Sequence, residues 1–243
     1  MGPATQTKPG VMSGLVGMLN VFVDPGATAR RVPAKLSWLW PLITISIIYV
    51  VFGYLLLPYT AGIADAAIAE RVTQQGLRPE QVERAQTMAR MFSRIAVAFT
   101  PLFLIVITLI LAWLVSVMGS ITGARAKFRD VFSLMAACSL IPALQYIAAF
   151  VVVRVKGDEV HSVEQLTPPF GLDIFLQDLH GVAFAVVNFF SIFEVWYIVV
   201  LTVGLSYLTK STKAKAFVTI APAWMLQLLL RVIQVSLAPG GRS

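Results

Sequence analysis

Five stretches of this chain are apolar over 20 or more residues, and they limit the folds open to it. A helix needs about 20 apolar residues to cross the roughly 30 Å of hydrocarbon in a bilayer. Within lipid only helices and closed barrels satisfy their backbone hydrogen bonds, and runs of this length exclude barrel strands. We therefore predict an all-α membrane protein, a bundle of five transmembrane helices. The predicted spans are Ser37–Leu57, Ile95–Met118, Val131–Val153, Val182–Leu208 and Phe217–Leu237, which together form one domain, residues 37–237.

The composition argues against two other classes of protein. The chain is 58% hydrophobic and 13% charged, whereas soluble domains carry about 25% charged residues. A soluble all-α protein of this composition would expose large apolar patches to water. The net charge of +7 comes from residues in loops beside the apolar runs, which is typical of membrane topology. Membrane lipids, and not nucleic acid, are therefore an expected partner.

No motif in the chain predicts catalysis, a cofactor or a metal. There is no Walker-type loop, no His-Glu-x-x-His and no Gly-x-Ser-x-Gly. A metal site built from Asp173, Asp178 and His180 would match no known ligand spacing, and His161 lies in the same loop. The one cysteine, Cys138, can form no intramolecular disulfide. We expect a protein that is not an enzyme and binds no cofactor.

Basic residues are unevenly divided between the two sides of a five-span chain. The side with the N-terminus has ten basic and two acidic residues, a net +8, and the other has eight basic and nine acidic, a net −1. The positive-inside rule then places the N-terminus in the cytoplasm and the short tail 238–243 outside. The basic residues expected to face anionic lipid are Arg30, Arg31, Lys35, Arg125, Lys127 and Arg129.

Residues 1–36 precede the first span and contain an amphipathic stretch. Its apolar residues recur at helical spacing: Val11, Leu15, Met18, Leu19 and Phe22. Such a helix can lie in the headgroup interface, or it can pack beneath the bundle as a leader helix. The residues leave both interpretations open, and the first would allow a role in shaping the membrane.

Residues 60–94, between the first and second spans, form the longest segment predicted to lie outside. They have the pattern of a helical hairpin. Ile63–Gln75 and Pro79–Arg94 both read as helices, and Gly76-Leu77-Arg78 separates them. Pro79 suits a first helical position. The apolar stripe of the second helix is thin, so the hairpin needs the rest of the protein or a partner to pack on. That stripe consists of Val82, Ala85, Met88, Ala89 and Phe92.

Two charges lie inside predicted spans. Glu194 is near the middle of a run of 27 otherwise uncharged residues, where a carboxylate costs roughly 2.5–3.5 kcal/mol. Arg231 lies in the next span, and both are about 21 Å from the cytoplasmic end of their spans. The pair can fix the register of two helices or form a polar path, and we favour the structural role because a nearby arginine keeps a carboxylate ionised. Supporting polar residues at similar depth are Asn188, Gln227 and Gln234.

Three stretches, in order along the chain, resemble the Yip1-domain family of five-span membrane proteins. The first is Phe22-Val23-Asp24-Pro25-Gly26-Ala27-Thr28, which is similar to the family's entry to its first span. The second is the Gly-rich and then basic-aromatic segment from Gly119 to Phe132, followed by Ile141-Pro142. The third is Phe193-Glu194-Val195-Trp196 with Gly204-Leu205 and Lys213-Ala214-Lys215-Ala216. The resemblance covers roughly residues 20–237.

The resemblance implies a role without enzymatic chemistry. Eukaryotic members of the family associate with small GTPases and the vesicle machinery of Golgi and ER membranes, and some bacterial members are linked with ABC exporters. The short N-terminal segment favours a bacterial inner-membrane protein. The resulting hypothesis is a membrane adaptor that associates with a transport complex such as an ABC-type exporter. The alternatives are a small transporter or channel that uses Glu194 and Arg231, and a membrane-shaping or trafficking protein.

Overall fold

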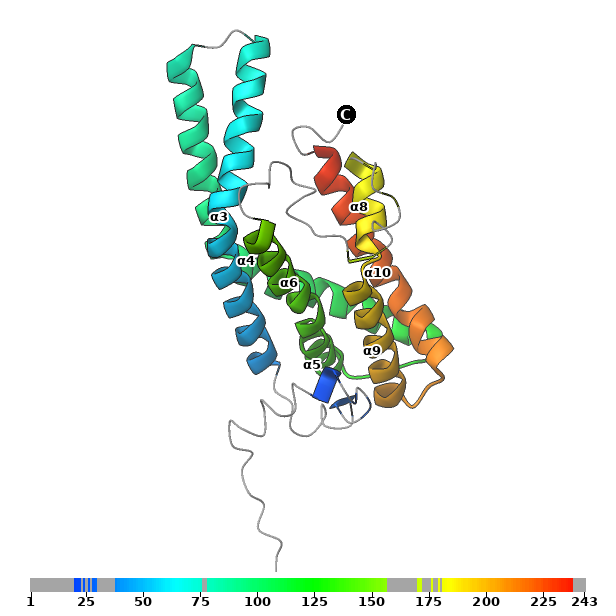
Figure 1. The fold of residues 1–243 in the computed structure, drawn as a ribbon. Coiled ribbons are helices and arrows are strands. Elements are labelled where there is room, and N and C mark those ends of the chain that lie inside the picture. The colour runs from blue at the N-terminus through cyan, green and yellow to red at the C-terminus, as the bar shows by residue number, and fades with distance from the viewer. Residues whose placement is uncertain are drawn as a thin grey trace, which may run out of the picture. The chain divides into compact units, whose positions relative to one another are not determined.

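The described part of the chain is almost entirely helical. The computed structural model describes residues 38–75, 78–156 and 181–237, together with 20–22, 24, 26, 28–29, 170–171, 176 and 179. Five of its helical stretches are long and apolar enough to cross a membrane, which confirms the predicted five-span integral membrane fold. The helices, shown in Figure 1, are α3 (Leu39–Gln75), α4 (Pro79–Thr122), α5 (Phe128–Cys138), α6 (Leu140–Lys156), α8 (Gly181–Phe189), α9 (Ile192–Thr209) and α10 (Lys213–Leu237).

The helices contribute to two compact units. Unit 1 consists of residues 1–44, 107–141 and 196–227, and unit 2 of residues 45–106, 142–195 and 228–243. The core of unit 1 is built around α5, whose residues from Val131 to Cys138 are all buried. Leu201 and Leu205 of α9 and Ile220 of α10 complete that core, each no more than 2% exposed. Unit 1 therefore has a buried apolar core to which α5, α9 and α10 contribute.

The described residues of the N-terminal segment pack into unit 1. Val21, Thr28 and Ala29 are at most 1% exposed. The ring of Phe22 lies 5.6 Å from that of Trp196 on α9, in a tilted arrangement. The choice between a leader helix and a helix lying in the headgroups stays a prediction for the amphipathic stretch as a whole. Residues 11–19, with Arg30, Arg31 and Lys35, lie outside the described residues.

The predicted hairpin is present in unit 2, and each of its helices continues directly from a span. α3 runs unbroken through Pro58, next to which the Thr60 hydroxyl donates a hydrogen bond to the Leu57 carbonyl at 3.1 Å. The two helices lie side by side in Figure 1, and the Arg90 guanidinium forms an ion pair with the Asp65 carboxylate at 2.5 Å. Closer to the predicted spans, a methyl group on Gly53 would lie 2.9 Å from Val97. We call residues 58–75 of α3 and 79–94 of α4 the arm.

Candidate functional site

The fourth apolar run, predicted as one span, forms two helices that meet at Phe190 and Ser191. α8 ends at Phe189 and α9 begins at Ile192. The Ser191 hydroxyl accepts a hydrogen bond from the backbone N–H of Glu194 at 3.2 Å, which makes Ser191 the N-cap of α9. Glu194 lies in the first turn of α9, where the helix dipole favours a negative charge. Glu194 therefore stands at the start of a helix and not at the middle of one.

The sequence carried a signal for this helix start that the hydropathy pattern concealed. Ser191-Ile192-Phe193-Glu194 has the Ser-x-x-Glu pattern of a capping box, in which the serine and the glutamate satisfy the orphan backbone groups of a first helical turn. Because apolar residues surround the motif on both sides, the run reads as a single span of 27 residues. The capping pattern is thus the better indicator of where the transmembrane helix begins.

A short extended segment from elsewhere in the chain covers the helix break. The backbone N–H of Ile192 donates to the Phe170 carbonyl at 2.8 Å, and Gly171 forms an isolated antiparallel bridge with Ser191. The rings of Phe170 and Phe193 meet edge to face at 5.4 Å. Within a membrane, non-helical backbone is tolerated only where other parts of the protein or a water-filled cavity supply its hydrogen bonds. Residues 170–171 supply one of them here.

Buried and half-buried polar side chains from α6, α8, α10 and the break itself lie around the same point. Asn188 of α8 is 1% exposed and accepts a hydrogen bond from the guanidinium of Arg231 on α10. Ser191 is also 1% exposed, and its hydroxyl donates to the amide oxygen of Gln145 on α6 at 3.1 Å. Nearby, the ring of Tyr49 on α3 packs at a tilt against that of Tyr146 on α6, with 4.8 Å between ring centroids. We call Gln145, Asn188, Ser191, Glu194 and Arg231 the break cluster.

The structure brings some of the predicted site residues together and separates others. Arg231 and Asn188 are in contact, whereas Gln234 is exposed on the surface of α10. Gln227 is half-buried and belongs to unit 1. A Glu194–Arg231 ion pair stays a prediction. The predicted lipid-facing residues within the described chain are exposed between α4 and the first turn of α5: Arg125, Lys127 and Arg129. Sequence reasoning did not anticipate Gln145 and Ser191.

The capping role of Ser191 gives a direct prediction. Ser191→Ala should lower the free energy of unfolding by about 1 kcal/mol, because the first turn of α9 loses its side-chain acceptor. Ser191→Thr should retain most of the stability, since threonine also caps helices. Ser236→Ala is a matched control, because the Ser236 hydroxyl only donates back to the Val232 carbonyl within α10. Equal losses at Ser191 and Ser236, measured by chemical denaturation in detergent, would contradict the capping role.

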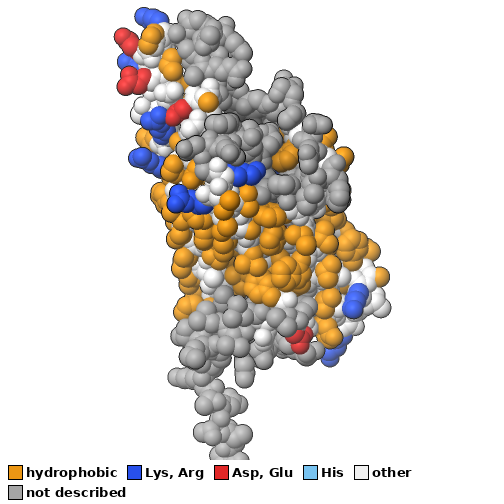
Figure 2. Space-filling view, in the orientation of Figure 1, with side chains coloured by type: hydrophobic (Ala, Val, Ile, Leu, Met, Phe, Trp, Pro, Cys, Tyr) orange, Lys and Arg blue, Asp and Glu red, His pale blue; other side chains and the backbone are white. Residues whose placement is uncertain are grey.

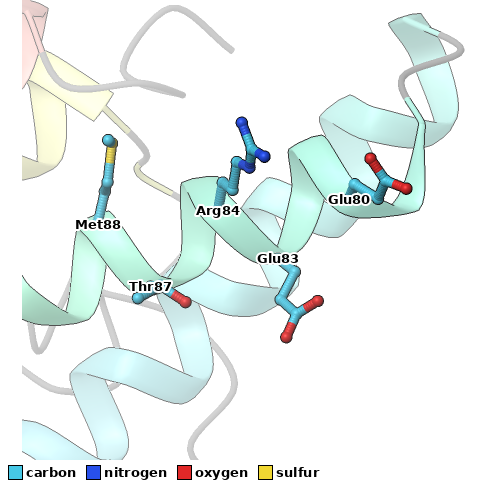
Figure 3. Close-up of a pocket in the computed structure, with 5 residues that line it drawn as sticks. All are labelled: Glu80, Glu83, Arg84, Thr87 and Met88. Carbon is cyan, nitrogen blue, oxygen red and sulfur yellow. The ribbon is translucent and has the colours of Figure 1, made fainter.

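A second feature with binding potential is a hollow on the arm. It has a volume of about 440 Å³ and is lined by Glu80, Glu83, Arg84, Thr87 and Met88 of α4. Figure 3 shows Arg84 and Met88 pointing to one side of the helix and Glu83 pointing to the other. Figure 2 shows basic and acidic side chains gathered on the arm, next to largely hydrophobic parts of α3 and α4. The hollow therefore combines both signs of charge with an apolar edge.

Among the described residues, no three His, Cys, Asp or Glu side chains lie close enough together to hold a metal ion. Asp173, Asp178, His161 and His180 lie outside the described residues. The break cluster contains two amides, a hydroxyl, a carboxylate and a guanidinium. These groups can bind a polar solute or hold helices in register.

Comparison with known proteins identifies the chain at the level of family. The family model described as the Yip1 domain matches residues 19–233, which is most of the chain and includes parts of both units. Searches of curated proteins and of solved structures gave no match.

Proposed function

This chain belongs to the Yip1 domain family of membrane proteins, and from that premise we propose that it is a non-enzymatic adaptor of another membrane complex. The proposed partner is a transport complex of the ABC-exporter type, in keeping with the bacterial proteins that the sequence resembles. The proposed location is a bacterial inner membrane with the N-terminus in the cytoplasm, because ten of the basic residues outside the spans lie on that side of a five-span chain.

The observation that carries the proposal is the length of α4. This helix has 44 residues and is therefore about 66 Å long, roughly twice the thickness of the hydrocarbon core. Its predicted span begins at Ile95, so about four turns, Pro79–Arg94, extend beyond it. A helical arm of this size is more than is needed to connect two spans.

Two contacts hold the arm together as a single element. The Arg90 guanidinium binds Asp65 with both its Nη2, at 2.5 Å, and its Nε, at 3.2 Å. Both nitrogens donate to the same oxygen, Asp65 Oδ2, so the ion pair joins the two helices at one point. A helical surface that is already formed loses less entropy when a partner binds.

The surface of the arm has the mixed character of a protein-binding site. Glu80, Glu83 and Arg84 are exposed around the hollow, with Met88 59% exposed at its edge. Interfaces between separately folded proteins combine an apolar centre with a polar rim. Methionine is common at binding surfaces because its flexible side chain adapts to a partner.

Photo-cross-linking in native membranes tests the adaptor role. A photoreactive amino acid at Glu80, beside the hollow, should form an adduct that mass spectrometry identifies as a subunit of an exporter. The same amino acid at Met225, which is 56% exposed on α10 in unit 1, serves as the control and should not give that adduct. An arm that forms no adduct with any other protein would contradict the proposal.

A specific observation also favours a second candidate, a small transporter. Discontinuous helices with polar groups at the break form the substrate and ion sites of many transporters. The break between α8 and α9, with Glu194 and Arg231 beside it, has that character. Protein in liposomes should then carry protons under an applied potential, detected with an enclosed pH dye, and Glu194→Gln should abolish the flux. A rate equal to that of empty liposomes would exclude proton transport at this site.

A further inference from the structure

The face of α4 that α3 covers is fixed by two contacts in unit 2. Arg90 binds Asp65 at 2.5 Å, and Val97 would touch a methyl group on Gly53 at 2.9 Å. These two α4 residues are seven apart, so they occupy the same position of a heptad and the same side of the helix. Residues two or five positions away from them lie near the opposite side of the helix, because each residue turns the helix by about 100°.

The side of α4 opposite to Arg90 and Val97 is a continuous apolar seam. Its members alternate in steps of four and three residues, which is the spacing of the contact positions in a coiled coil. Each is between 44% and 63% exposed. We call these residues the α4 seam: Met88, Phe92, Ile95, Phe99, Leu102 and Val106.

Lipid accounts for only part of this exposure. The seam from Ile95 to Val106 belongs to the predicted span, where apolar side chains facing lipid are expected. Met88 and Phe92, which are 59% and 63% exposed, precede that span and belong to the arm. A helical face turned to water normally carries polar residues. The first turns of the seam therefore need a protein surface to cover them.

We propose that the α4 seam pairs with the α4 seam of a second copy of this chain. The positive-inside rule gives every copy the same orientation in the membrane, so the two helices run parallel and equal residues meet. Such a pair places Phe92 against Phe92 and Met88 against Met88, and the apolar contact continues into the bilayer. The α4 helix of a second copy therefore offers a seam that matches this one in length and depth.

The positions of the charges fit self-pairing. Between Pro79 and Val106 the charged residues are Glu80, Glu83, Arg84, Arg90 and Arg94. Four of them lie away from the seam, at the outer positions of the heptad. Arg84 lies at the seam's edge, where a parallel pair places it opposite Ala89 of the second copy. No like charges meet, which is the condition that parallel coiled coils need.

Self-pairing does not rest on the adaptor role, although the two surfaces share one residue. Of the residues that line the hollow, Met88 belongs to the seam and Arg84 lies at its edge, whereas Glu80, Glu83 and Thr87 lie off the seam. A dimer would therefore cover Met88 and leave Glu80, Glu83 and Thr87 accessible.

Cysteine cross-linking in native membranes tests the pairing. In a Cys138→Ala background, Met88→Cys and Phe92→Cys should form disulfide-linked dimers under mild oxidation, because equal residues of a parallel pair approach within disulfide distance. Thr87 is an exposed neighbour off the seam. Thr87→Cys should give about tenfold less dimer, because equal residues off the seam are too far apart in a parallel pair to form a disulfide. Equal yields at Thr87, no dimer at either seam position, or adducts only with another protein would overturn the proposal.

A charge placed on the seam gives a second measurement. Phe92→Glu should raise the dissociation constant of the dimer in detergent by roughly 100-fold or more, because the contact would bury two unpaired like charges. Thr87→Glu adds the same charge beside the seam and should leave the constant within about threefold of the wild type. Both sites are exposed in the monomer, so the folding of each variant is preserved and can be checked by thermal denaturation. A dimer unaffected by Phe92→Glu would overturn the pairing.

Discussion

Asn188→Leu should lower the free energy of unfolding by about 1.5–3 kcal/mol, the range for loss of a hydrogen bond to a charged group. Asn188 is 1% exposed and accepts a hydrogen bond from the Arg231 guanidinium. Leucine fills a similar volume but offers no acceptor, so the guanidinium loses a partner in apolar surroundings. Chemical denaturation in detergent, followed by circular dichroism, measures the loss.

A double-mutant cycle separates the contact from general damage to the site. Arg231→Leu alone leaves the Asn188 amide oxygen without this donor, whereas Asn188→Leu with Arg231→Leu removes both partners together. The double variant should therefore lose less stability than the sum of the two single variants, by about 1 kcal/mol or more. Gln234→Leu, at an exposed position on the same helix, should change stability by less than about 0.5 kcal/mol. Fully additive losses would show that Asn188 and Arg231 act separately.

The same cycle can be extended to the predicted ion pair. Glu194→Gln and Arg231→Gln should each lower the melting temperature in detergent. If the two charges are coupled, the double variant should be no less stable than either single variant. The reason is that a single substitution leaves one charge unpaired, whereas the double substitution removes both. Additive losses would show that Glu194 and Arg231 are not coupled, and the stabilising role of Glu194 would then be its favourable position in the first turn of α9. This outcome decides between a pair that sets helix register and a carboxylate available for other chemistry.

The spans could be predicted because membrane insertion depends on properties that the sequence states directly. The length and hydrophobicity of a run determine whether it can cross the bilayer, and both are local. The arm was predictable for a similar reason, since Pro79 and the glycine-containing turn before it mark the boundary between its helices. The continuity of α3 through Pro58 could not be predicted, because the effect of a proline on a helix depends on how neighbouring groups satisfy the carbonyl that it frees.

The break cluster could be predicted only in part. Counting residues predicts similar depths for Asn188 and Arg231, and the two side chains are in contact. The rotation of each helix about its axis depends on packing across the bundle, which one sequence does not contain. Arg231 is half-buried and reaches Asn188, whereas Gln234, three residues later, is exposed. Gln145 lies in a predicted span whose apolar part contains no charged residue, so the sequence pattern did not indicate it as a partner for Ser191.

The close approach of residues 170–171 to the helix break was invisible to sequence analysis and leads to the largest expected effect. Gly171→Ala should lower the free energy of unfolding by about 2–4 kcal/mol, combining overpacking with the loss of a backbone hydrogen bond. A methyl group there would lie 2.4 Å from the Phe190 carbonyl oxygen and 2.8 Å from the Ser191 Cα. Both are backbone atoms and cannot rotate away, so residues 170–171 must withdraw. The bond from the Ile192 N–H to the Phe170 carbonyl is then weakened or lost.

Gly62→Ala is the matched control, because the same substitution should have the opposite sign there. Gly62 lies within α3, and a methyl group at that position would meet no atom within 4 Å. Alanine in a helix interior is more stable than glycine by about 0.5–1 kcal/mol, so this variant should gain stability. Hydrogen exchange at the Ile192 amide provides a local readout, since protection should fall in Gly171→Ala and stay unchanged in Gly62→Ala. If Gly171→Ala retains both its stability and the Ile192 protection, residues 170–171 do not hold the helix break.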